Sequence, residues 1–453
     1  MSSERTTAGL RVVSAEELGL AEREPVDAGA RRAALEIVEA VRAEGAAAVR
    51  RFAGEFDGLG ADESLVLGKE AMSAASERID AEVRGALERA AGRIGAFARE
   101  QLASVRSFEM EIGGGVAGQT WRAMERAGCY APGGRYPLPS SVLMTVCPAR
   151  AAGVERVVLA TPGVREGTAR GDVMLAAAGI AGADAVLRVG GAQAVAALAY
   201  GLGAGGSGED VVLKEGVDVV VGPGNAYVTA AKQLVSGVVA IDMLAGPSEL
   251  VVIADGEADA GTVAADLLAQ AEHDPMASVT LISLDSGLVE RVNAALSEQL
   301  EALPTRAVAE ASVRENGRAV VVGSAAEAVA LSDRLAPEHL EVMVGGAEES
   351  RALAEGVRHA GAVFIGEGAA EVFGDFGLGP NHTLPTGGTA RSFAGLSVHT
   401  FLRARTHIRC GGGLGESDGS GRLDALAMAD AVTLARVEGL EGHARSAERR
   451  MRL

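Results

Sequence analysis

Two spacings of hydrophobic residues divide the chain. Between residues 27 and 109, apolar side chains recur at helical spacing opposite charged ones, as in AALEIVEAVRAEGAAAVRRFAGEF and AEVRGALERAAGRIGAFAREQL. This pattern is typical of amphipathic helices. From residue 128 onward the chain instead shows short, fully apolar runs that alternate with helical stretches.

The apolar runs predict buried strands, and they are VERVVLATP, AVLRVGG, VDVVVGPGN, ELVVIAD, SVTLISL, RAVVVG and GAVFIGEG. Apolar strands separated by helices are typical of parallel sheets that are covered on both faces. These seven runs are more strands than one half of a doubly wound sheet contains. The simplest α/β arrangement is therefore two Rossmann-like lobes.

The boundaries of this arrangement follow from the same pattern. We expect an N-terminal helical region at 1–127 that contributes to the first lobe, Rossmann-like lobes at 128–246 and 247–385, and a C-terminal extension at 386–453. Within the extension, the Gly- and Ser-rich stretch at 409–422 predicts a flexible loop. One helical run follows at 423–450, and it either packs on its own chain or reaches a neighbour.

Composition narrows the class of protein. The 453 residues are 48% hydrophobic and 23% charged, which is typical of a folded chain. A formal charge of −19 argues against a nucleic-acid partner. No apolar run approaches the ~20 residues of a membrane helix. The start, MSSERTTAGL, does not resemble a signal peptide. The three cysteines, Cys129, Cys147 and Cys410, are scattered, which predicts idle thiols in a reducing cytoplasm. Together with the short apolar runs, this leads us to expect a cytoplasmic protein without a membrane partner.

Gln270 and His273 end a helical stretch, ADAGTVAADLLAQAEHD, and share one face of it. An amide oxygen and an imidazole nitrogen make half of a metal site. Taken alone, the pattern is more typical of a partly exposed helix end, because it lacks the paired cysteines of a strong zinc signature.

Pro337 suits the first turn of a helix, which predicts that Glu338 and His339 lie in that turn. Oxidation of an alcohol needs a base for the hydroxyl proton, and histidine is the natural choice near neutral pH. Taken alone, an acid and a histidine at a solvated helix start explain the pattern as well.

Asp375 is flanked by glycine in FGDFG, ahead of GPNHT. Glycine lets the backbone hold an exposed carboxylate in an unusual conformation, which suits a ligand, although Gly-Asp is also ordinary in turns.

Glu438 and His443 lie about 140° apart on an ideal terminal helix, so they cannot approach one atom but could hold different parts of a small ligand. Without such a ligand they would simply belong to a surface helix.

Glycine-rich turns follow two of the apolar runs, at Gly190-Gly191-Ala192-Gln193 and Val221-Gly222-Pro223-Gly224-Asn225. Glycine at the end of a strand lets a ligand approach the backbone, as in nucleotide-binding crevices. No G-x-G-x-x-G opens a helix after a strand, so the pattern alone does not establish dinucleotide binding.

In this order, the motifs resemble the histidinol dehydrogenase family from about residue 30 to the C-terminus. The resemblance rests on CYAPGG running into LPSSVLM, then GGAQAVAALAYG, VGPGNAYV, IDMLAGPSELVVIAD, LLAQAEHDP, APEHLE, GDFGLGPNHTLPT and VEGLEGHARS. One motif is a weak signal, whereas the series is specific.

The resemblance implies one zinc ion per subunit, held by Gln270, His273, Asp375 and His443, a set that suits zinc. In the family this ion binds the substrate's amino and imidazole nitrogens, so its main role is positioning.

Glu338 and His339 match the catalytic pair. His339 would take the hydroxyl proton as a first NAD accepts hydride. Glu338 would then activate water to attack histidinaldehyde, and His339 would serve again as a second NAD is reduced. The implied activity is oxidation of L-histidinol to L-histidine, the last step of histidine biosynthesis.

The remaining contacts also follow from the resemblance. NAD-contacting positions are matched by Tyr130, Gln193 and Asn225. Substrate contacts are matched by Ser248, Gln270, His273, His339, Asp375, Glu438 and His443. The family forms a homodimer in which the C-terminal segment completes the partner's site.

Some features fit less closely. Phe376 stands where many relatives carry Tyr, a change that should be tolerated. His359, His382, His399 and His407 match no site position and are expected to be structural. Two alternatives remain open: a paralogue that oxidises another small alcohol such as a hydroxysulfonate, and a catalytically dead scaffold or nucleotide-binding module.

Overall fold

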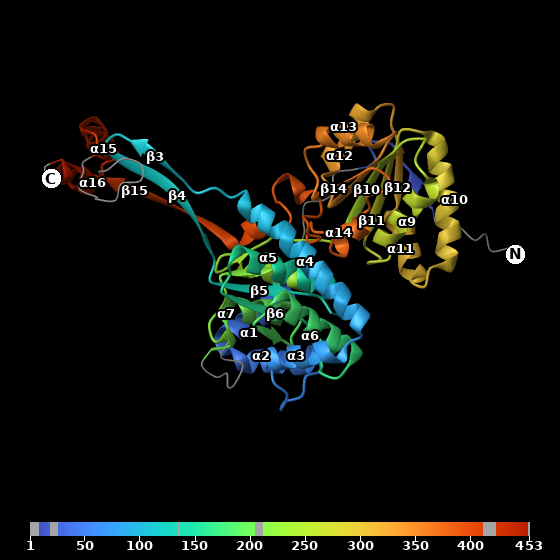
Figure 1. Cartoon of the computed structure of the whole chain (residues 1–453), viewed down its shortest axis with the longest axis horizontal. Coiled ribbons are helices and arrows are strands. Elements are labelled where there is room, and N and C mark those ends of the chain that lie inside the picture. The colour runs from blue at the N-terminus through green and yellow to red at the C-terminus, as the bar shows by residue number, and fades with distance from the viewer. Residues whose placement is uncertain (1–8, 19–25, 134–135, 204–211, 411–422, 452–453) are drawn as a thin grey trace.

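Two lobes, each built around a largely parallel sheet, form the body of the molecule (Figure 1). The computed structural model describes residues 9–18, 26–133, 136–203, 212–410 and 423–451. The mixed α/β architecture confirms the predicted fold class, and each of the apolar runs contains a strand. Most of the loop predicted at 409–422 lies outside the described residues.

The first sheet has six strands. In spatial order they are β2 (Val66–Leu67), β7 (Ala185–Leu187), β6 (Arg156–Ala160), β5 (Arg126–Tyr130), β8 (Val219–Val221) and β9 (Ala240–Ile241). All neighbouring strands are parallel except β2 and β7, which are antiparallel. One face packs on α3 (Lys69–Arg78), α4 (Ala81–Ala103), α5 (Pro139–Ala152) and α6 (Ala169–Ala181). The other packs on α1 (Ala28–Glu44), α2 (Ala46–Phe56), α7 (Gly191–Tyr200) and α8 (Ala226–Val235). Both faces are therefore covered, which explains why the strands are apolar throughout.

The second sheet is parallel throughout. Its order is β1 (Arg11–Val12), β12 (Arg318–Val321), β11 (Ser278–Ser283), β10 (Glu249–Ala254), β13 (His339–Met343) and β14 (Ala362–Ile365). Its faces are covered by α9 (Ala260–Ala271), α10 (Ser286–Ala302) and α11 (Arg306–Asn316), and by α12 (Ala325–Leu335) and α13 (Ala347–Gly356). Strand β1 crosses from the N-terminal region into this second lobe, a pairing that the sequence does not reveal.

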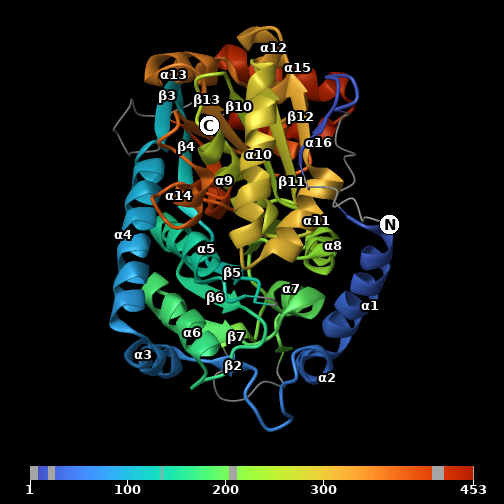
Figure 2. The ribbon, with the colours of Figure 1, turned by 90° about the vertical axis from the view of Figure 1, so that its right-hand side faces the viewer.

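The lobes meet along α4, which runs beside both of them (Figure 2). The short helix α14 (Glu371–Asp375) ends close to α4, where the Arg93 side chain donates to the carbonyl oxygen of Gly377 at 2.7 Å. Gly377 has φ 88°, and a Cβ there would lie 2.8 Å from that of Ala90. Glycine is therefore required where α14 leaves toward the first lobe.

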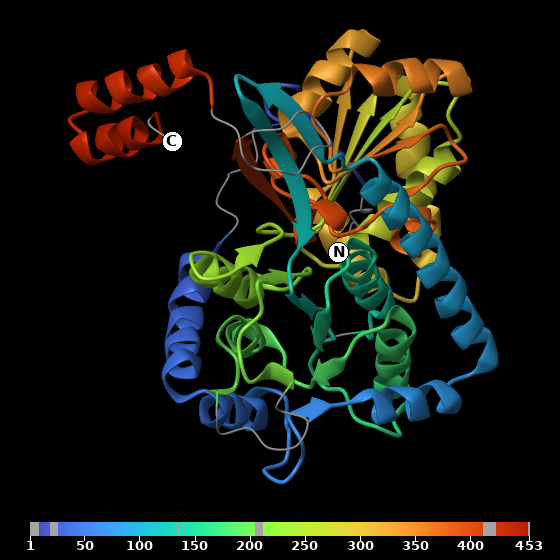
Figure 3. The ribbon, with the colours of Figure 1, turned by 60° about the vertical axis from the view of Figure 1, so that its left-hand side comes forward.

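A three-stranded antiparallel arm projects from the body, and the sequence did not predict it. Its order is β15 (Leu402–Cys410), β4 (Gly115–Ala123) and β3 (Phe108–Ile112). The short 3-10 turns η3 (Thr389–Arg391) and η4 (Val398–Phe401) precede β15. At the tip lie α15 (Ala425–Val437) and α16 (Glu441–Arg450), where the Asp424 N–H donates to the Gly113 carbonyl oxygen at 2.7 Å. These helices stand beside the two lobes, not on them (Figure 3).

The prediction of one helical run at 423–450 is wrong, because α15 and α16 are separate helices. Gly439 has φ 77°, its N–H donates to the carbonyl oxygen of Arg436, and that of Leu440 donates to the carbonyl oxygen of Ala435. This is a Schellman cap, which ends a helix at a left-handed glycine.

The prediction that Pro337 starts a helix is also wrong. Helix α12 ends just before it at Ala336, which takes a left-handed conformation with φ 50°. Proline lacks the N–H that would continue a helix and disfavours right-handed helical backbone at the residue before it, here Ala336. His339 therefore opens the buried strand β13.

Among the described residues, no helix is both long enough and apolar enough to cross a bilayer.

Candidate active site

His339 lies at the centre of a buried group of acidic side chains. It opens β13 opposite Leu250 of β10, and its Nδ1 lies 3.2 Å from the carbonyl oxygen of Glu249. A carbonyl can only accept, so Nδ1 carries the hydrogen and Nε2 is the basic nitrogen. Burial lowers the pKa of His339 to about 3. The imidazole is therefore neutral, which is the form that accepts a proton.

Glu338 is buried beside this histidine. Its Oε2 lies 3.8 Å from His339 Nδ1 and accepts a hydrogen bond from the Glu249 N–H at 3.0 Å. The Ser248 side chain lies within hydrogen-bonding reach of the Glu338 carboxyl. Burial is the main cause that holds the pKa of Glu338 well above its ordinary value. A carboxyl with a raised pKa is a stronger proton acceptor once it is ionised.

The structure brings His273 and Asp375 to the same place. His273 Nε2 lies 3.8 Å from Asp375 Oδ2, and Asp375 Oδ1 lies 4.0 Å from His339 Nε2. His273 follows α9 in a turn, where its N–H donates to the carbonyl oxygen of Gln270 at 3.3 Å. The carboxylate of Asp375 thus lies between two imidazoles.

The side chain of Gln270 has an unusual environment. It is buried near the end of α9, and neither its Oε1 nor its Nε2 has a hydrogen-bond partner. A buried amide without partners is costly, so such a group calls for a ligand or ion that satisfies it. Within the described residues, no three His, Cys, Asp or Glu side chains are arranged to hold a metal ion. The side chains that could hold a metal ion here are one imidazole, one carboxylate and the orphaned amide of Gln270.

Further carboxyl groups near this site were not identified from the sequence: the buried Asp266, Glu341 and Glu371, and the partly exposed Glu249. Glu371 Oε2 lies 3.5 Å from His339 Nδ1, and burial is the main cause that raises the pKa of Glu371. The useful signal was spacing. Glu371 precedes Asp375 by one helical turn, and Glu341 shares a strand face with His339. The helix wrongly predicted at Pro337 concealed the second relationship.

Tyr130 and Gln193, two predicted cofactor contacts, meet at the carboxyl end of the first sheet. The Tyr130 hydroxyl accepts from the Gly191 N–H at 3.2 Å. Asp57 joins this group, because its carboxyl accepts from the Gln193 side chain at 3.2 Å and from the Gly190 N–H at 3.0 Å. Asp57 lies far away in sequence, in a turn after α2, and no motif pointed to it.

Asn225, the third predicted cofactor contact, caps α8 by accepting from two backbone N–H groups. The turn that leads to it starts at Gly222, where φ is 119° and a Cβ would lie 2.0 Å from the Tyr130 carbonyl oxygen. The Gly222 N–H donates to Asp242 at 2.7 Å, and its carbonyl oxygen accepts from Lys232 at 3.0 Å. A buried ion pair of Lys232 and Asp242 therefore holds this turn against Tyr130.

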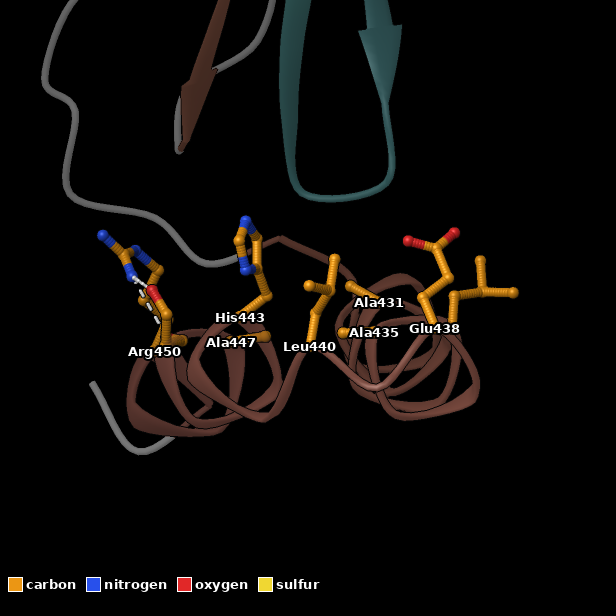
Figure 4. A pocket seen from close by; sticks show the side chains of 9 residues that line it. Ala431, Ala435, Glu438, Leu440, His443, Ala447 and Arg450 are labelled. Atoms are coloured by element: carbon orange, nitrogen blue, oxygen red, sulfur yellow. Dashed lines mark hydrogen bonds between the residues drawn. The ribbon is translucent and has the colours of Figure 1, made fainter.

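Glu438 and His443 lie apart from the His339 group within one chain. Both line a groove of about 380 Å³ between α15 and α16 and point to the same side of the helical pair (Figure 4). The break at Gly439 makes this possible, since one continuous helix would turn them apart. Because these helices stand at the tip of the arm, the chain does not bring either residue to its own site (Figures 1 and 3).

The histidines without an assigned role fall into two groups. His359 and His399 make local contacts, and His407 Nε2 lies 3.0 Å from Glu109 Oε1 in the arm. His382 is different, because its Nε2 is buried without a partner and burial lowers its pKa to about 4. Phe376, which stands in place of the usual tyrosine, is 65% exposed.

Fold and site together define a two-lobed α/β enzyme with a neutral imidazole and a carboxyl of raised pKa in one buried group. The family model for histidinol dehydrogenase matches residues 21–451. The chain belongs to the histidinol dehydrogenase family, whose members are oxidoreductases.

Individual relatives agree with this assignment. The chain is 46% identical to the histidinol dehydrogenase of Thermus thermophilus, over 91% of this chain and 93% of the relative. It is 45% identical to that of Parasynechococcus marenigrum, over 92% and 90%. The crystal structure of histidinol dehydrogenase from Elizabethkingia anophelis superposes with a TM-score of 0.84 at 31% identity, covering 98% of this chain and 97% of that one.

Proposed function

We propose that this protein oxidises L-histidinol to L-histidine through histidinaldehyde, with two NAD, in the last step of histidine biosynthesis. The observation that carries the proposal is the buried pair of Glu338 and His339 beside His273 and Asp375. A catalytically dead scaffold is disfavoured, because each position that the reaction needs holds a competent side chain.

We assign one zinc ion per subunit to Gln270, His273 and Asp375 of one chain and His443 of a partner. Imidazole, carboxylate and amide suit zinc, and the orphaned amide of Gln270 supports the assignment. When bound, zinc would orient the amino and imidazole nitrogens of the substrate.

The proton transfers fall to this chain's own residues. His339 Nε2, neutral and without a partner, would accept the hydroxyl proton as the alcohol becomes an aldehyde. Glu338 would then take a proton from the water that adds to the aldehyde, and His339 would deprotonate the resulting hydrate. Each contribution is worth roughly 10²–10⁴-fold in rate.

We place NAD, which takes up the two hydrides, in the 128–246 lobe at Tyr130, Gln193 and Asn225. These residues follow the carboxyl ends of β5, β7 and β8, three parallel strands of the first sheet, and open α/β sheets bind nucleotides at this edge. Lobe 247–385 would then supply the base and most zinc ligands.

We further propose a homodimer with shared sites, in which the extension at 386–453 completes the partner's site. Glu438 and His443 would join Ser248, Gln270, His273, His339 and Asp375 around the substrate. Exposed apolar side chains on the terminal helices support this, since Leu434 is 62% and Val437 81% exposed. Such side chains are typical of an interface. A cytoplasmic location fits the buried free thiols Cys129 and Cys147.

The deciding experiment is NADH formation from L-histidinol, with and without a chelator, and with dihydroxypropane sulfonate as the competing substrate. We expect turnover of histidinol only, abolished by the chelator and restored by zinc. Preferred turnover of the sulfonate would instead establish the paralogue, and no turnover of either would contradict the proposal.

A further inference from the structure

Two buried carboxyl groups outside the proposed catalytic machinery join the elements that carry it. Asp266 lies on α9 and Glu341 on β13, and their carboxyl groups lie within hydrogen-bonding reach of each other. Glu341 is fully buried, and its Oε1 also accepts from the N–H of Glu371, the first residue of α14, at 2.8 Å. Glu341 therefore contacts both neighbouring elements.

The spacing of these residues ties each one to a proposed site residue. Four residues separate neighbours on a helical face, and two separate neighbours on a strand face. The pairs related in this way are Asp266 with Gln270 on α9, Glu341 with His339 on β13, and Glu371 with Asp375 on α14.

The contact between the two carboxyl groups needs a proton. Glu341 Oε2 and Asp266 Oδ2 are buried and have no donor among the described residues. Two ionised carboxylates in contact repel each other, whereas one shared proton turns the contact into a hydrogen bond. Burial is the main cause that raises the pKa of both groups, and for Glu341 the neighbouring Asp266 adds to it. Singly protonated, the pair carries one negative charge.

We propose that Asp266 and Glu341 are positioning residues, whose carboxyl–carboxyl hydrogen bond holds α9, β13 and α14 in the register that the zinc and base sites require. We call this pair the carboxyl clasp. The inference rests on the proposed function, because it concerns the placement of Gln270 and Asp375 as ligands.

A purely space-filling role predicts a different response to substitution. Replacing both members of a buried polar pair by apolar side chains is often neutral for stability, whereas removing one member leaves the other buried without a partner. Glu341→Leu is therefore expected to lower stability as well as zinc affinity, and the two effects are measured separately. Glutamine at 341 is the matched conservative change. Its amide oxygen can accept from Glu371, and its amide N–H₂ can donate to an ionised Asp266, so that both hydrogen bonds and the single negative charge remain.

The experiment measures zinc affinity by competition with a chromophoric chelator, on full-length wild-type protein and on Glu341→Gln and Glu341→Leu. We expect Glu341→Gln to bind zinc as the wild type does. We expect Glu341→Leu to bind it roughly 10- to 100-fold more weakly, the usual loss when an outer contact of a metal site is removed. The unfolding temperature of each metal-free protein is measured in parallel.

A control variant in the first lobe tests whether the loss of any buried carboxylate contact is enough to lower zinc affinity. Asp172→Asn weakens a buried carboxylate's ion pair with Arg78, so it should lower stability and leave zinc affinity unchanged. If Glu341→Leu does not fold, Asp266→Asn and Asp266→Leu make the same comparison from the other side of the clasp.

The outcomes are distinguishable. Wild-type protein that binds no zinc and leaves histidinol unoxidised overturns the proposed function, and the clasp with it. A zinc-binding wild type whose Glu341→Leu variant keeps full affinity overturns the clasp alone. Equal losses in the Gln and Leu variants also overturn it, because the hydrogen bonds survive in only one of them.

Discussion

His273 Nε2 lies 3.8 Å from Asp375 Oδ2, although the first residue follows α9 and the second ends α14. The periodicity of the sequence does not predict that these two helices contact each other. The approach depends on the packing of α14 against α9 at one end of the second lobe. A carboxylate held between His273 and His339 is well placed to be a ligand to a cation.

Replacing Asp375 by Asn should therefore remove zinc and activity together. The amide keeps the shape but loses the negative charge that attracts the ion, so the loss should exceed the roughly 10- to 100-fold typical of outer contacts. Zinc content after dialysis and NADH formation measure the two effects. Asp274→Asn is the matched control, since Asp274 is exposed and only caps a turn. Full zinc content in Asp375→Asn would show that it is not a ligand.

Replacing Glu338 by Gln should separate the two oxidations. Glutamine can still accept the hydrogen bond from the Glu249 N–H, but it cannot take a proton from water. Oxidation of histidinol to the aldehyde should persist, while oxidation of added histidinaldehyde should fall roughly 10²–10⁴-fold. Single-turnover rates with each substrate check this. Equal losses in both steps would rule out the water-activating role.

The sequence predicted the layered fold well because apolar strands and amphipathic helices leave local patterns. It missed the arm, although FEMEI in β3 and LRARTHIRC in β15 alternate apolar and polar residues as strands do. The pairing of β15 with β4 joins segments far apart in the sequence, which leaves no local signal. It also placed Glu338 and His339 in a helix, because the preference of proline for a first turn competed with a left-handed helix end at Ala336. Asp57 was missed because a long-range contact between single residues has no local period, whereas Glu341 was missed because the helix wrongly predicted at Pro337 concealed its place on the strand face of His339.

Replacing Asp57 by Ala should weaken NAD binding. Asp57 accepts a hydrogen bond from the Gln193 amide nitrogen, and it therefore fixes the orientation in which the amide oxygen points away from Asp57. Without it the amide can rotate, and we expect KM for NAD to rise roughly tenfold, the value of one hydrogen bond, with little change in kcat. Asp62→Asn, on an exposed turn nearby, serves as the control. A fall in kcat at unchanged KM would contradict a positioning role at the cofactor site.

The metal-free protein should lose stability as pH rises. Burial is the main cause that raises the pKa of Glu249 to about 7 from the ordinary 4.5. The folded state therefore keeps a proton that the unfolded state has lost, so this stabilisation is present below about pH 4.5 and disappears as pH passes about 7. Thermal unfolding across that range measures it. Glu249→Gln, whose amide oxygen can still accept from Gly387, should flatten the profile. An unchanged slope would exclude Glu249 as the cause.

The arrangement of subunits can be tested by mixing two inactive proteins. If sites are shared, each site takes His339 from one chain and His443 from the other. A heterodimer of His339→Ala and His443→Ala chains then contains one site with both defects and one intact site. Random exchange makes half of the dimers mixed, so about one quarter of wild-type activity should return.

If His443 served its own chain instead, every site in the mixture would carry one defect. Differently tagged chains, purified on both tags in turn, isolate the heterodimer and raise the expected recovery to about one half. Each homodimer alone is the control and should stay inactive. No recovery in verified heterodimers would exclude sharing, and it would require the terminal helices to fold back from the tip of the arm onto their own second lobe.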